Sequence, residues 1–356
     1  MSTKFCELLL KWDQKGNDRP MPWKGEKDPY KIWLSEIILQ QTRVEQGWAY
    51  YERFVKKYPN IHLLAKAKDQ EVFKLWEGLG YYNRCKNLLF TARQIVADLN
   101  GKFPNTYENL LQLKGVGPYT AAAIASFAYN LPHAVVDGNV FRVFARYYGI
   151  NTPTDSKEGI DVFNKIAFEN LAKNKAGIYN QALMDFGATV CKPATPLCSS
   201  CVMNKGCAAF LQNTVGQLPV KLKVIQKKKR CFDYFFFIVG NTFYLQQRQP
   251  GDIWAGLYQP YLLEPERLMT STQKEVSDML ENHLSIDVPI LKIELNTQLY
   301  QQQLTHQLLT VRFTTIYLQS VPTILRQGKW IKLAQRAKYP FPKTIKDYLE
   351  KDASFV

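Results

Sequence analysis

Apolar residues along the first 212 positions recur at the spacing of amphipathic helices. Phe5, Leu8, Leu9 and Trp12 follow the i, i+3, i+4, i+7 pattern that places side chains on one helix face. Similar segments follow one another to about residue 212, and short Gly, Pro and Asn breaks separate them. The pattern predicts a mainly α-helical region over residues 1–212.

The pattern changes at Phe232. Residues 232–239 are aromatic and β-rich, Gly240 and Asn241 are typical of a turn, and residues 242–247 complete a predicted hairpin. The remaining pattern predicts strands over 290–300, 308–318 and 329–333, and helices over 271–284 and 343–351. Residues 232–356 are therefore expected to form an α+β second domain.

Residues 213–231 separate the two regions and are read as a basic linker. Six Lys or Arg residues fall between positions 221 and 230. A solvated linker explains most of this charge, although a linker lying along DNA would use the same side chains.

Charge and hydropathy narrow the class of protein. The formal net charge is +15, which favours a polyanionic partner, with nucleic acid first and a generic basic surface as the alternative. No apolar run approaches the roughly 18 residues of a membrane span, and the amphipathic N-terminus does not read as a signal peptide. We expect a cytoplasmic protein whose thiols bind metals and do not form disulfides.

Four of the seven cysteines form a dense cluster with the spacing C-x6-C-x2-C-x5-C: Cys191, Cys198, Cys201 and Cys207. One short loop then supplies four thiolates, enough for one iron–sulfur cluster or one zinc ion. The alternative is four unrelated thiols. Cys6, Cys85 and Cys231 are interpreted as structural.

A glycine turn lies between two predicted helices over residues 110–124. Gly115 and Gly117 allow a tight turn around Val116, and Pro118 suits the first position of the second helix. N–H groups exposed at such a turn can bind a DNA phosphate. An ordinary helix–helix turn is the alternative.

Two carboxylates are candidates for catalysis. Asp137 precedes an apolar periodic stretch, so it either caps a helix or stands as a carboxylate in a cleft. Glu36 follows Asp28 and Pro29, a good helix start, and has apolar neighbours on nearly every face. Burial would raise its pKa and keep it protonated; a Glu that turns outward or pairs with a Lys is the alternative.

The order of glycine hairpin, Asp and four-cysteine loop is similar to that of the helix-hairpin-helix, endonuclease III-like DNA glycosylases. The segment W-L-S-E-I-I-L-Q-Q-T over 33–42, with Pro22 and Trp23 before it and 78–82 after it, resembles the adenine DNA glycosylases, the MutY family. The resemblance covers about residues 5–212 and extends more loosely to the C-terminus. It implies a helical glycosylase fold holding one 4Fe-4S cluster, followed by a Nudix-like domain.

The resemblance also implies a function. Such an enzyme is a monomer that flips and removes adenine paired with 8-oxoguanine or guanine in double-stranded DNA. Glu36 would be the general acid and Asp137 would stabilise the cationic sugar, with Tyr119 and Asn139 orienting them. Tyr119 stands where bifunctional relatives have a Schiff-base Lys, so no strand-cleaving activity is expected. A cytoplasmic, nucleoid-associated bacterial protein would fit.

Further residues take their roles from the same resemblance. Arg19, Trp23 and Lys24 match the pocket wall, and Gln181 matches the position that contacts adenine. Gln40, Gln41 and Tyr81 match the wedge positions, which Leu39 and Val44 flank. Gly115, Val116 and Gly117 would bind the DNA backbone. In the second domain Leu304, Thr305 and His306 stand at the family's F-S-H loop, which reads 8-oxoguanine. That domain lacks the Nudix carboxylate box, so magnesium-dependent nucleotide hydrolysis is not expected. A thymine-mismatch glycosylase, a non-catalytic cluster-bearing DNA reader and a zinc-stapled structural protein are the rival readings.

Overall fold

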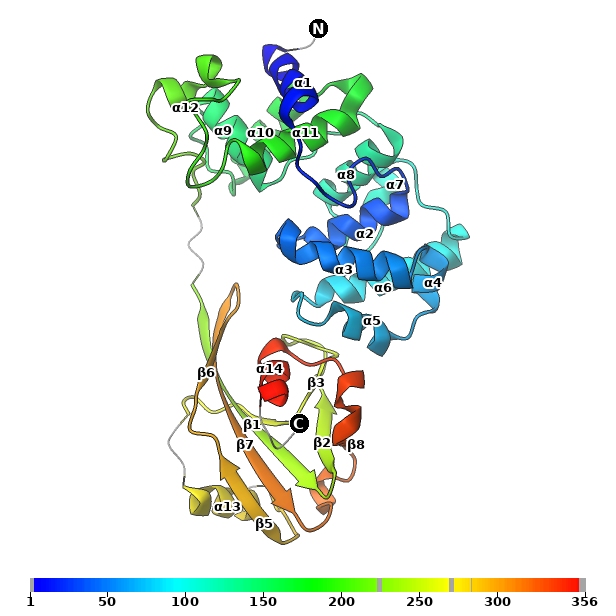
Figure 1. Cartoon of the computed structure of the whole chain (residues 1–356), viewed down its shortest axis with the longest axis vertical. Coiled ribbons are helices and arrows are strands. Elements are labelled where there is room, and N and C mark those ends of the chain that lie inside the picture. Colours follow the sequence, from blue (N-terminus) through cyan, green and yellow to red (C-terminus); the bar gives the residue numbers. More distant parts are fainter. Residues whose placement is uncertain (1–2, 223–225, 269–271, 283, 352–356) are drawn as a thin grey trace. The chain divides into compact units, whose positions relative to one another are not determined.

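The computed structural model describes residues 3–222, 226–268, 272–282 and 284–351, which fold as two compact units (Figure 1). The first unit comprises Met1–Ala67 and Asn83–Lys223, and the second comprises Lys68–Tyr82 and Val224–Val356. The first is helical and the second is built on a mixed sheet, which confirms the predicted fold class. Within the described residues, no helix combines the length and apolar character needed to cross a membrane.

The helices of the first unit follow one another with short connections, as the apolar periodicity predicts. They are α1 Lys4–Gly16, α2 Pro29–Leu39, α3 Val44–Lys57, α4 Ile61–Lys66, α6 Asn83–Leu99, α7 Tyr107–Leu111, α8 Pro118–Tyr129, α9 Gly138–Tyr148, α10 Lys157–Asn170, α11 Ala176–Thr189 and α12 Ala208–Leu211, with 3-10 turns η1 Lys173–Lys175 and η2 Asn204–Gly206.

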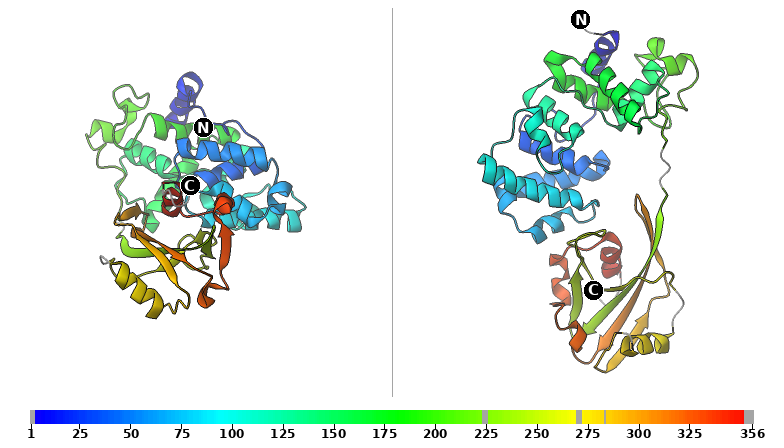
Figure 2. Two further views of the ribbon diagram at one scale, coloured as in Figure 1. Left: turned by 60° about the horizontal axis from the view of Figure 1, so that its bottom comes forward. Right: turned by 180° about the vertical axis from the view of Figure 1, so that it is seen from behind.

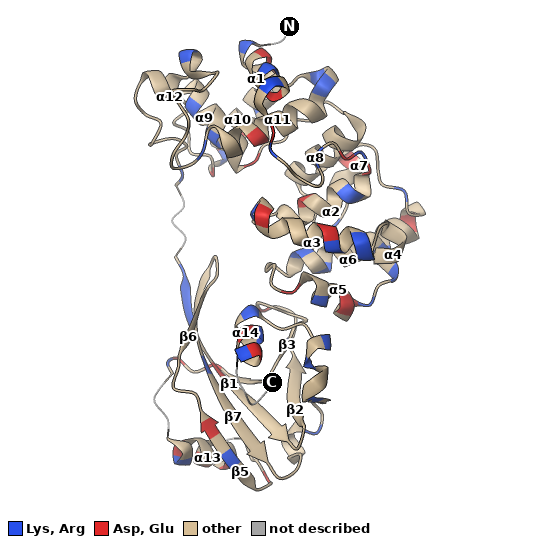
Figure 3. Ribbon diagram, viewed as in Figure 1, with Lys and Arg blue, Asp and Glu red and all other residues tan. Residues whose placement is uncertain are grey.

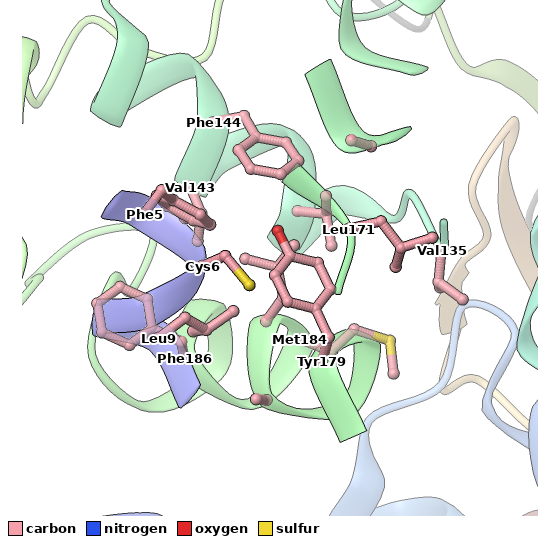
Figure 4. Packing of buried hydrophobic residues seen from close by; sticks show 14 of the residues in the cluster. Phe5, Cys6, Leu9, Val135, Val143, Phe144, Leu171, Tyr179, Met184 and Phe186 are labelled. Atoms are coloured by element: carbon pink, nitrogen blue, oxygen red, sulfur yellow. The ribbon is translucent and has the colours of Figure 1, made fainter. Parts of the chain in front are cut away.

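The N-terminal helix packs into a core formed mainly by α9 and α11. Phe5 and Leu9 of α1 are fully buried, and the Phe5 ring lies 5.3 Å from that of Phe144 on α9. Tyr179 and Phe186 of α11 complete this contact (Figure 4). Each such buried side chain contributes roughly 1.5–3 kcal/mol of transfer free energy. The packing fixes α9 and α11 against each other, and it thereby fixes the positions of Asp137, which caps α9, and of Asp185 on α11.

The predicted glycine turn joins α7 to α8. Gly115 has φ +80, and a Cβ at this position would lie 2.8 Å from the Cβ of Asn87, so glycine meets both the conformational and the steric requirement. Val116 is buried and anchors the turn, whereas Gly115 and Gly117 are exposed. Gly117 is the N-cap of α8, which begins at Pro118 as predicted.

The second unit contains a mixed sheet with the strand order β3-β2-β1-β7-β5. Strands β1 and β7 are parallel, and the other pairs are antiparallel. The elements are α5 Asp69–Trp76, β1 Lys228–Val239, β2 Thr242–Gln247, β3 Tyr258–Gln259, β4 Tyr261–Leu263, α13 Gln273–Asn282, β5 Ile290–Leu295, β6 Tyr300–Gln303, β7 Gln307–Leu318, η3 Thr323–Leu325, β8 Lys329–Lys332, η4 Leu333–Lys338 and α14 Lys343–Lys351.

The aromatic run in β1 is explained by burial on both faces of the sheet. Phe232 and Phe236 pack in a cluster with residues of α14, and Phe235 and Phe237 pack in a cluster with residues of α13. Figure 2 shows the ribbon of this sheet from two further directions. Successive residues of a strand point to opposite faces. A strand covered on both sides therefore reads as a continuous apolar run, without the alternation of a half-exposed strand.

Three strand predictions need correction. Strand β1 begins at Lys228, not Phe232, because its first residues pair with β7 from Gln307 onward. The single strand expected over 290–300 is two strands, β5 and β6, since the side chain of Asn296 accepts from the N–H of Gln298 and turns the chain. The short strands β3 and β4 were not predicted. Helix α13 lies within the predicted range 271–284, of which residues 271 and 283 lie outside the described residues.

Helix α5 groups with the second unit, which the sequence pattern did not predict. The backbone N–H of Phe341 donates to Glu77 Oε1 at 2.8 Å. Lys74 Nζ donates to the Tyr339 carbonyl at 3.1 Å, and Gln70 Nε2 donates to the Lys338 carbonyl at 2.8 Å. These polar contacts join residues that are far apart in sequence.

The predicted linker is attached to folded structure on both sides of residues 223–225, which lie outside the described residues. Its beginning is attached to the first unit, where the N–H of Thr154 donates to the Val220 carbonyl at 3.0 Å. Its basic end forms the start of β1, which is blue in Figure 3. Arg230 there is paired with Asp252 at 2.7 Å and with Glu264 at 2.5 Å. The two ion pairs neutralise the charge of Arg230, and they join β1 to other parts of the second unit.

Candidate active site

Glu36 lies on α2, whose start is set by local sequence. The N–H of Tyr30 donates to Asp28 Oδ1 at 2.9 Å, and Pro29 occupies the first helical position, as predicted. The helix is buried from Ile32 to Ile38, and Glu36 is 5% exposed. Burial raises the pKa of Glu36 to about 7, a hydrogen bond with Tyr119 opposes the shift, and the charge of Asp137 adds to it. The predicted raised pKa of Glu36 is confirmed.

Asp137 is the N-cap of α9, as one of the two readings predicted, and its charge acts on Glu36. Its Oδ1 accepts from the N–H groups of Asn139 and Val140, each at 2.8 Å, and its Oδ2 accepts from Asn139 Nδ2 at 2.7 Å. Burial raises the pKa of Asp137, while these hydrogen bonds and the charge of Arg142 lower it. A carboxylate held by three N–H donors is well supported in its ionised form.

The fold brings Glu36, Tyr119, Asp137 and Asn139 together, although they come from three separate helices, α2, α8 and the start of α9. The charge of Asp137 acts on Glu36, and burial together with both carboxyls raises the pKa of Tyr119. The Tyr119 hydroxyl also lies 3.5 Å from Met184 Sδ. The N–H donors around Asp137 favour its ionised form, whereas burial favours the protonated form of Glu36. One carboxylic acid beside one carboxylate is the combination used for breaking glycosidic bonds.

A cavity of about 180 Å³ opens beside Glu36. Its walls include Trp23, Lys24, Phe127 and Gln181. Three of the predicted pocket residues, Trp23, Lys24 and Gln181, are therefore together next to the buried acid. Arg19 does not line this cavity. It binds the carboxylate of Asp185, which Lys24 and Gln181 also contact.

Asp185 on α11 is fully buried and holds four polar groups. Its Oδ1 accepts from Arg19 Nη1 at 2.9 Å and Gln181 Nε2 at 3.0 Å, and its Oδ2 accepts from Asn17 Nδ2 at 3.0 Å. Lys24 Nζ lies 3.3 Å from Oδ2. Sequence reasoning missed Asp185. The signal was present, since this residue is an acid within an apolar helical run, as Glu36 is.

The predicted wedge residues of the first unit lie at and after the end of α2. Leu39 ends α2, Gln40 caps it, and Val44 begins α3. Gln41 is exposed and has φ 54, an unusual conformation for a residue with a side chain. Buried Arg84 was missed by sequence reasoning. Its guanidinium donates to the carbonyls of Gln40 at 2.5 Å, Ile38 at 2.7 Å and Ile37 at 3.0 Å, and so holds the end of α2.

Tyr81, Thr305 and His306 belong to the second unit. Tyr81 also has a positive φ, 49, and its hydroxyl forms a hydrogen bond with that of Thr305. His306 is exposed in the turn between β6 and β7, where its carbonyl accepts from the N–H of Lys228 at 2.9 Å. The other predicted site residues belong to the first unit.

The four cysteines Cys191, Cys198, Cys201 and Cys207 are half-buried free thiols that line one cavity of about 30 Å³. Burial raises the pKa of Cys201 to about 11, and its cysteine neighbours add to that shift. In the described parts of the chain, no three His, Cys, Asp or Glu side chains are grouped so as to hold a single metal ion. The donor set nevertheless suits thiolate-bound iron, because the cavity is shared by all four sulfurs.

Two buried arginines attach the cysteine loop to α9, and neither was predicted. Arg142 Nε donates to the Cys191 carbonyl at 2.7 Å, and its Nη2 donates to Asn139 Oδ1 at 2.8 Å. Arg146 Nη1 donates to the Lys192 carbonyl at 2.7 Å. Gly187 allows α11 to lie close to α9, because a Cβ at position 187 would lie only 2.7 Å from the Cβ of Asn139. The loop and the helix capped by Asp137 are thus held as one assembly.

Comparison with known families agrees with both units. Residues 34–163 match the family described as HhH-GPD superfamily base excision DNA repair protein. Residues 234–351 match the family described as NUDIX domain.

Three relatives of this chain are described as adenine DNA glycosylases. An adenine DNA glycosylase of Buchnera aphidicola subsp. Schizaphis graminum is 30% identical over 349 residues, covering 97% of this chain and 98% of the relative. That of Buchnera aphidicola subsp. Baizongia pistaciae is 37% identical, covering 71% and 72%, and that of Mus musculus is 42% identical, covering 61% and 44%. The solved structure of a thermostable thymine-DNA glycosylase aligns with a TM-score of 0.54 and 31% identity, covering 58% of this chain and 95% of that one. This chain belongs to the adenine DNA glycosylase family, enzymes of base excision repair that hydrolyse N-glycosidic bonds.

Proposed function

We propose that the chain acts as a monomer on double-stranded DNA and removes adenine paired with 8-oxoguanine or guanine. It does so by acid-assisted hydrolysis of the N-glycosidic bond, without cutting the strand. The observation that carries this proposal is a buried Glu36 that lines a cavity of about 180 Å³, with its pKa raised to about 7 by burial and by the charge of the hydrogen-bonded Asp137. The descriptions of the relatives support adenine as the base.

Glu36 is the general acid. Adenine is a poor leaving group until it is protonated, and a flipped base would bring N7 within reach of a carboxyl in this cavity. A pKa of about 7 keeps Glu36 protonated up to neutral pH, so the proton is available where the enzyme works. After the base departs, the Glu36 carboxylate acts as the base that activates water.

Asp137 stabilises the oxocarbenium-like sugar that remains. Asn139 donates to it from both backbone and side chain, which fixes the carboxylate relative to the sugar position. Tyr119 hydrogen-bonds to Glu36 and orients the acid. A phenol cannot form the Schiff base that a lysine amine would form at this position, so strand breaks appear only after alkali.

The cavity residues and the wedge residues bind the DNA around the lesion. Trp23, Lys24 and Gln181 form the adenine pocket and Arg19 supports it, since all but Trp23 meet at one buried carboxylate. Leu39, Gln40, Gln41, Val44 and Tyr81 fill the space left by the flipped base. Positive φ values at Gln41 and Tyr81 support this role, because such conformations gather at functional sites.

The backbone grip is sequence-independent. The exposed turn of Gly115, Val116 and Gly117 precedes α8, whose first N–H groups point out of the helix end and can bind a phosphate. The net charge of +15 favours this association with DNA.

Thr305 and His306 recognise the base opposite adenine. His306 is exposed in the β6–β7 turn, and Thr305 is hydrogen-bonded to Tyr81. His306→Ala is expected to lower the ratio of single-turnover rates for A:8-oxoguanine over A:G by about fivefold, the size of one lost hydrogen bond. Gln303→Ala, an exposed change on β6, is the control. An unchanged ratio in His306→Ala would place lesion recognition elsewhere.

Cys191, Cys198, Cys201 and Cys207 would hold one 4Fe-4S cluster, whose role here is to brace the loop that Arg142 and Arg146 attach to α9. The purified chain is expected to be brown and to contain iron, and Cys201→Ser is expected to lose most of both. Visible absorbance and metal analysis measure this. A colourless protein with one zinc ion per chain would contradict the iron–sulfur cluster and would indicate a structural zinc site.

A single-turnover assay tests the function as a whole. Duplexes carry A opposite 8-oxoguanine, A opposite G, or T opposite G, and alkali follows to cut abasic sites. Adenine release from the first two duplexes, with breaks only after alkali, is the expected result. Release of thymine alone would indicate a thymine-mismatch enzyme, and binding without release would indicate a non-catalytic reader.

A further inference from the structure

Gln181 lines the cavity beside Glu36, and one end of its amide is already engaged. Its Nε2 donates to Asp185 Oδ1 at 3.0 Å. An ionised carboxylate has no hydrogen to give and can only accept hydrogen bonds. The amide nitrogen, and not the amide oxygen, must therefore face Asp185, and the carbonyl oxygen is the end left for the cavity.

The neighbours of Asp185 hold its side chain in place. It is fully buried, and two cations, Arg19 at 2.9 Å and Lys24 at 3.3 Å, face it. Asn17 Nδ2 donates to its Oδ2 at 3.0 Å. A buried carboxylate with this many donors cannot rotate without leaving polar groups unpaired, which is unfavourable.

We infer that Asp185 is a positioning residue that determines base specificity, because it orients the Gln181 amide so that an acceptor oxygen faces the base. This inference rests on the proposed excision of adenine and deepens it. Adenine carries an exocyclic amine at C6, which donates to that oxygen, next to the N7 that Glu36 protonates. A purine with a carbonyl at C6, such as hypoxanthine, would set two acceptors against each other and is rejected.

The test compares single-turnover release of adenine and of hypoxanthine opposite 8-oxoguanine, using the full chain with its metal. Asp185→Asn removes the charge and can pair with either end of the Gln181 amide, so the adenine-to-hypoxanthine ratio is expected to fall about tenfold or more. In a Gln181→Ala background the same substitution is expected to leave the ratio within about twofold, because the amide through which Asp185 acts is gone. Asp161→Asn, the same change at an exposed position of α10, is the control.

A second variant leaves the buried carboxylate intact. Gln181→Met keeps the length of the side chain but has no amide oxygen and only a weakly accepting sulfur, so the ratio is expected to fall as in Asp185→Asn. This result holds even if Asp185→Asn does not fold. Full selectivity in Gln181→Met, or an equal effect of Asp185→Asn with and without Gln181, would overturn the inference. Absence of adenine release by the unmodified chain would instead overturn the proposed function.

Discussion

Asp137→Asn is expected to reduce adenine release by about 10³-fold or more while binding to the mismatch survives. The substitution removes the charge that stabilises the oxocarbenium-like sugar, an electrostatic contribution of this order in enzymes. Asn remains a good N-cap, so its side-chain oxygen can still accept from the N–H groups of Asn139 and Val140 that now bind Oδ1. Single-turnover rates and equilibrium binding on the A:8-oxoguanine duplex measure the two effects separately.

A matched control for this variant is Asp161→Asn, an exposed site on α10 away from the catalytic carboxylates. It should change neither the rate nor the binding. If Asp137→Asn lost release and binding to the same extent, Asp137 would serve only as the cap of α9. The separation of the two readouts is therefore what distinguishes the catalytic from the structural role.

Glu36→Gln is expected to reduce adenine release by about 10²–10⁴-fold, the usual contribution of a general acid. In the unmodified chain the single-turnover rate should fall as pH rises through about 7, because the protonated form of Glu36 is the active one. Rate-against-pH profiles of the chain and of Glu45→Gln, an exposed carboxyl on α3, should coincide. Full activity in Glu36→Gln would remove Glu36 as the acid.

The raised pKa of Glu36 also predicts an effect on stability. The folded state binds the proton more tightly than the unfolded state, whose value is 4.5, so stability falls as pH rises from there to about 7. Above pH 7 the buried carboxylate costs up to about 3 kcal/mol, at 1.36 kcal/mol for each pKa unit. Glu36→Gln should therefore unfold at a higher urea concentration than the unmodified chain at pH 8 but not at pH 4. An equal difference at both values would mean that Glu36 is not the cause.

The local sequence was enough to predict the start of a helix where that start depends only on neighbouring residues. The start of α2 follows from Asp28 and Pro29, and the start of α8 follows from Gly117 and Pro118. A capping side chain or a proline acts within one turn of the helix, so no distant contact is needed. The burial of Glu36 could be predicted for a related reason, because apolar neighbours surround it on its own helix.

Longer-range pairing could not be predicted in the same way. The strand expected over 290–300 divides into β5 and β6 because both strands pair with β7, and β1 starts at Lys228 because its partner residues in β7 do. Main-chain pairing between strands depends little on side-chain identity, so the sequence carries little record of it. Helix α5 groups with the second unit through side chains that bond to the main chain of residues 338–341, and the main-chain partner of such a side chain cannot be recognised by its residue type.

By itself the sequence determined the fold class, the family resemblance, the positions of Glu36 and Asp137, and the four thiols in one loop. Each depends on residue type and short spacing. Only the tertiary structure placed Glu36 beside Asp137, and only it revealed Asp185 between Arg19, Lys24 and Gln181. Charged groups from separate helices interact through space, and burial in a shared core, not nearness in the chain, sets the strength of that interaction.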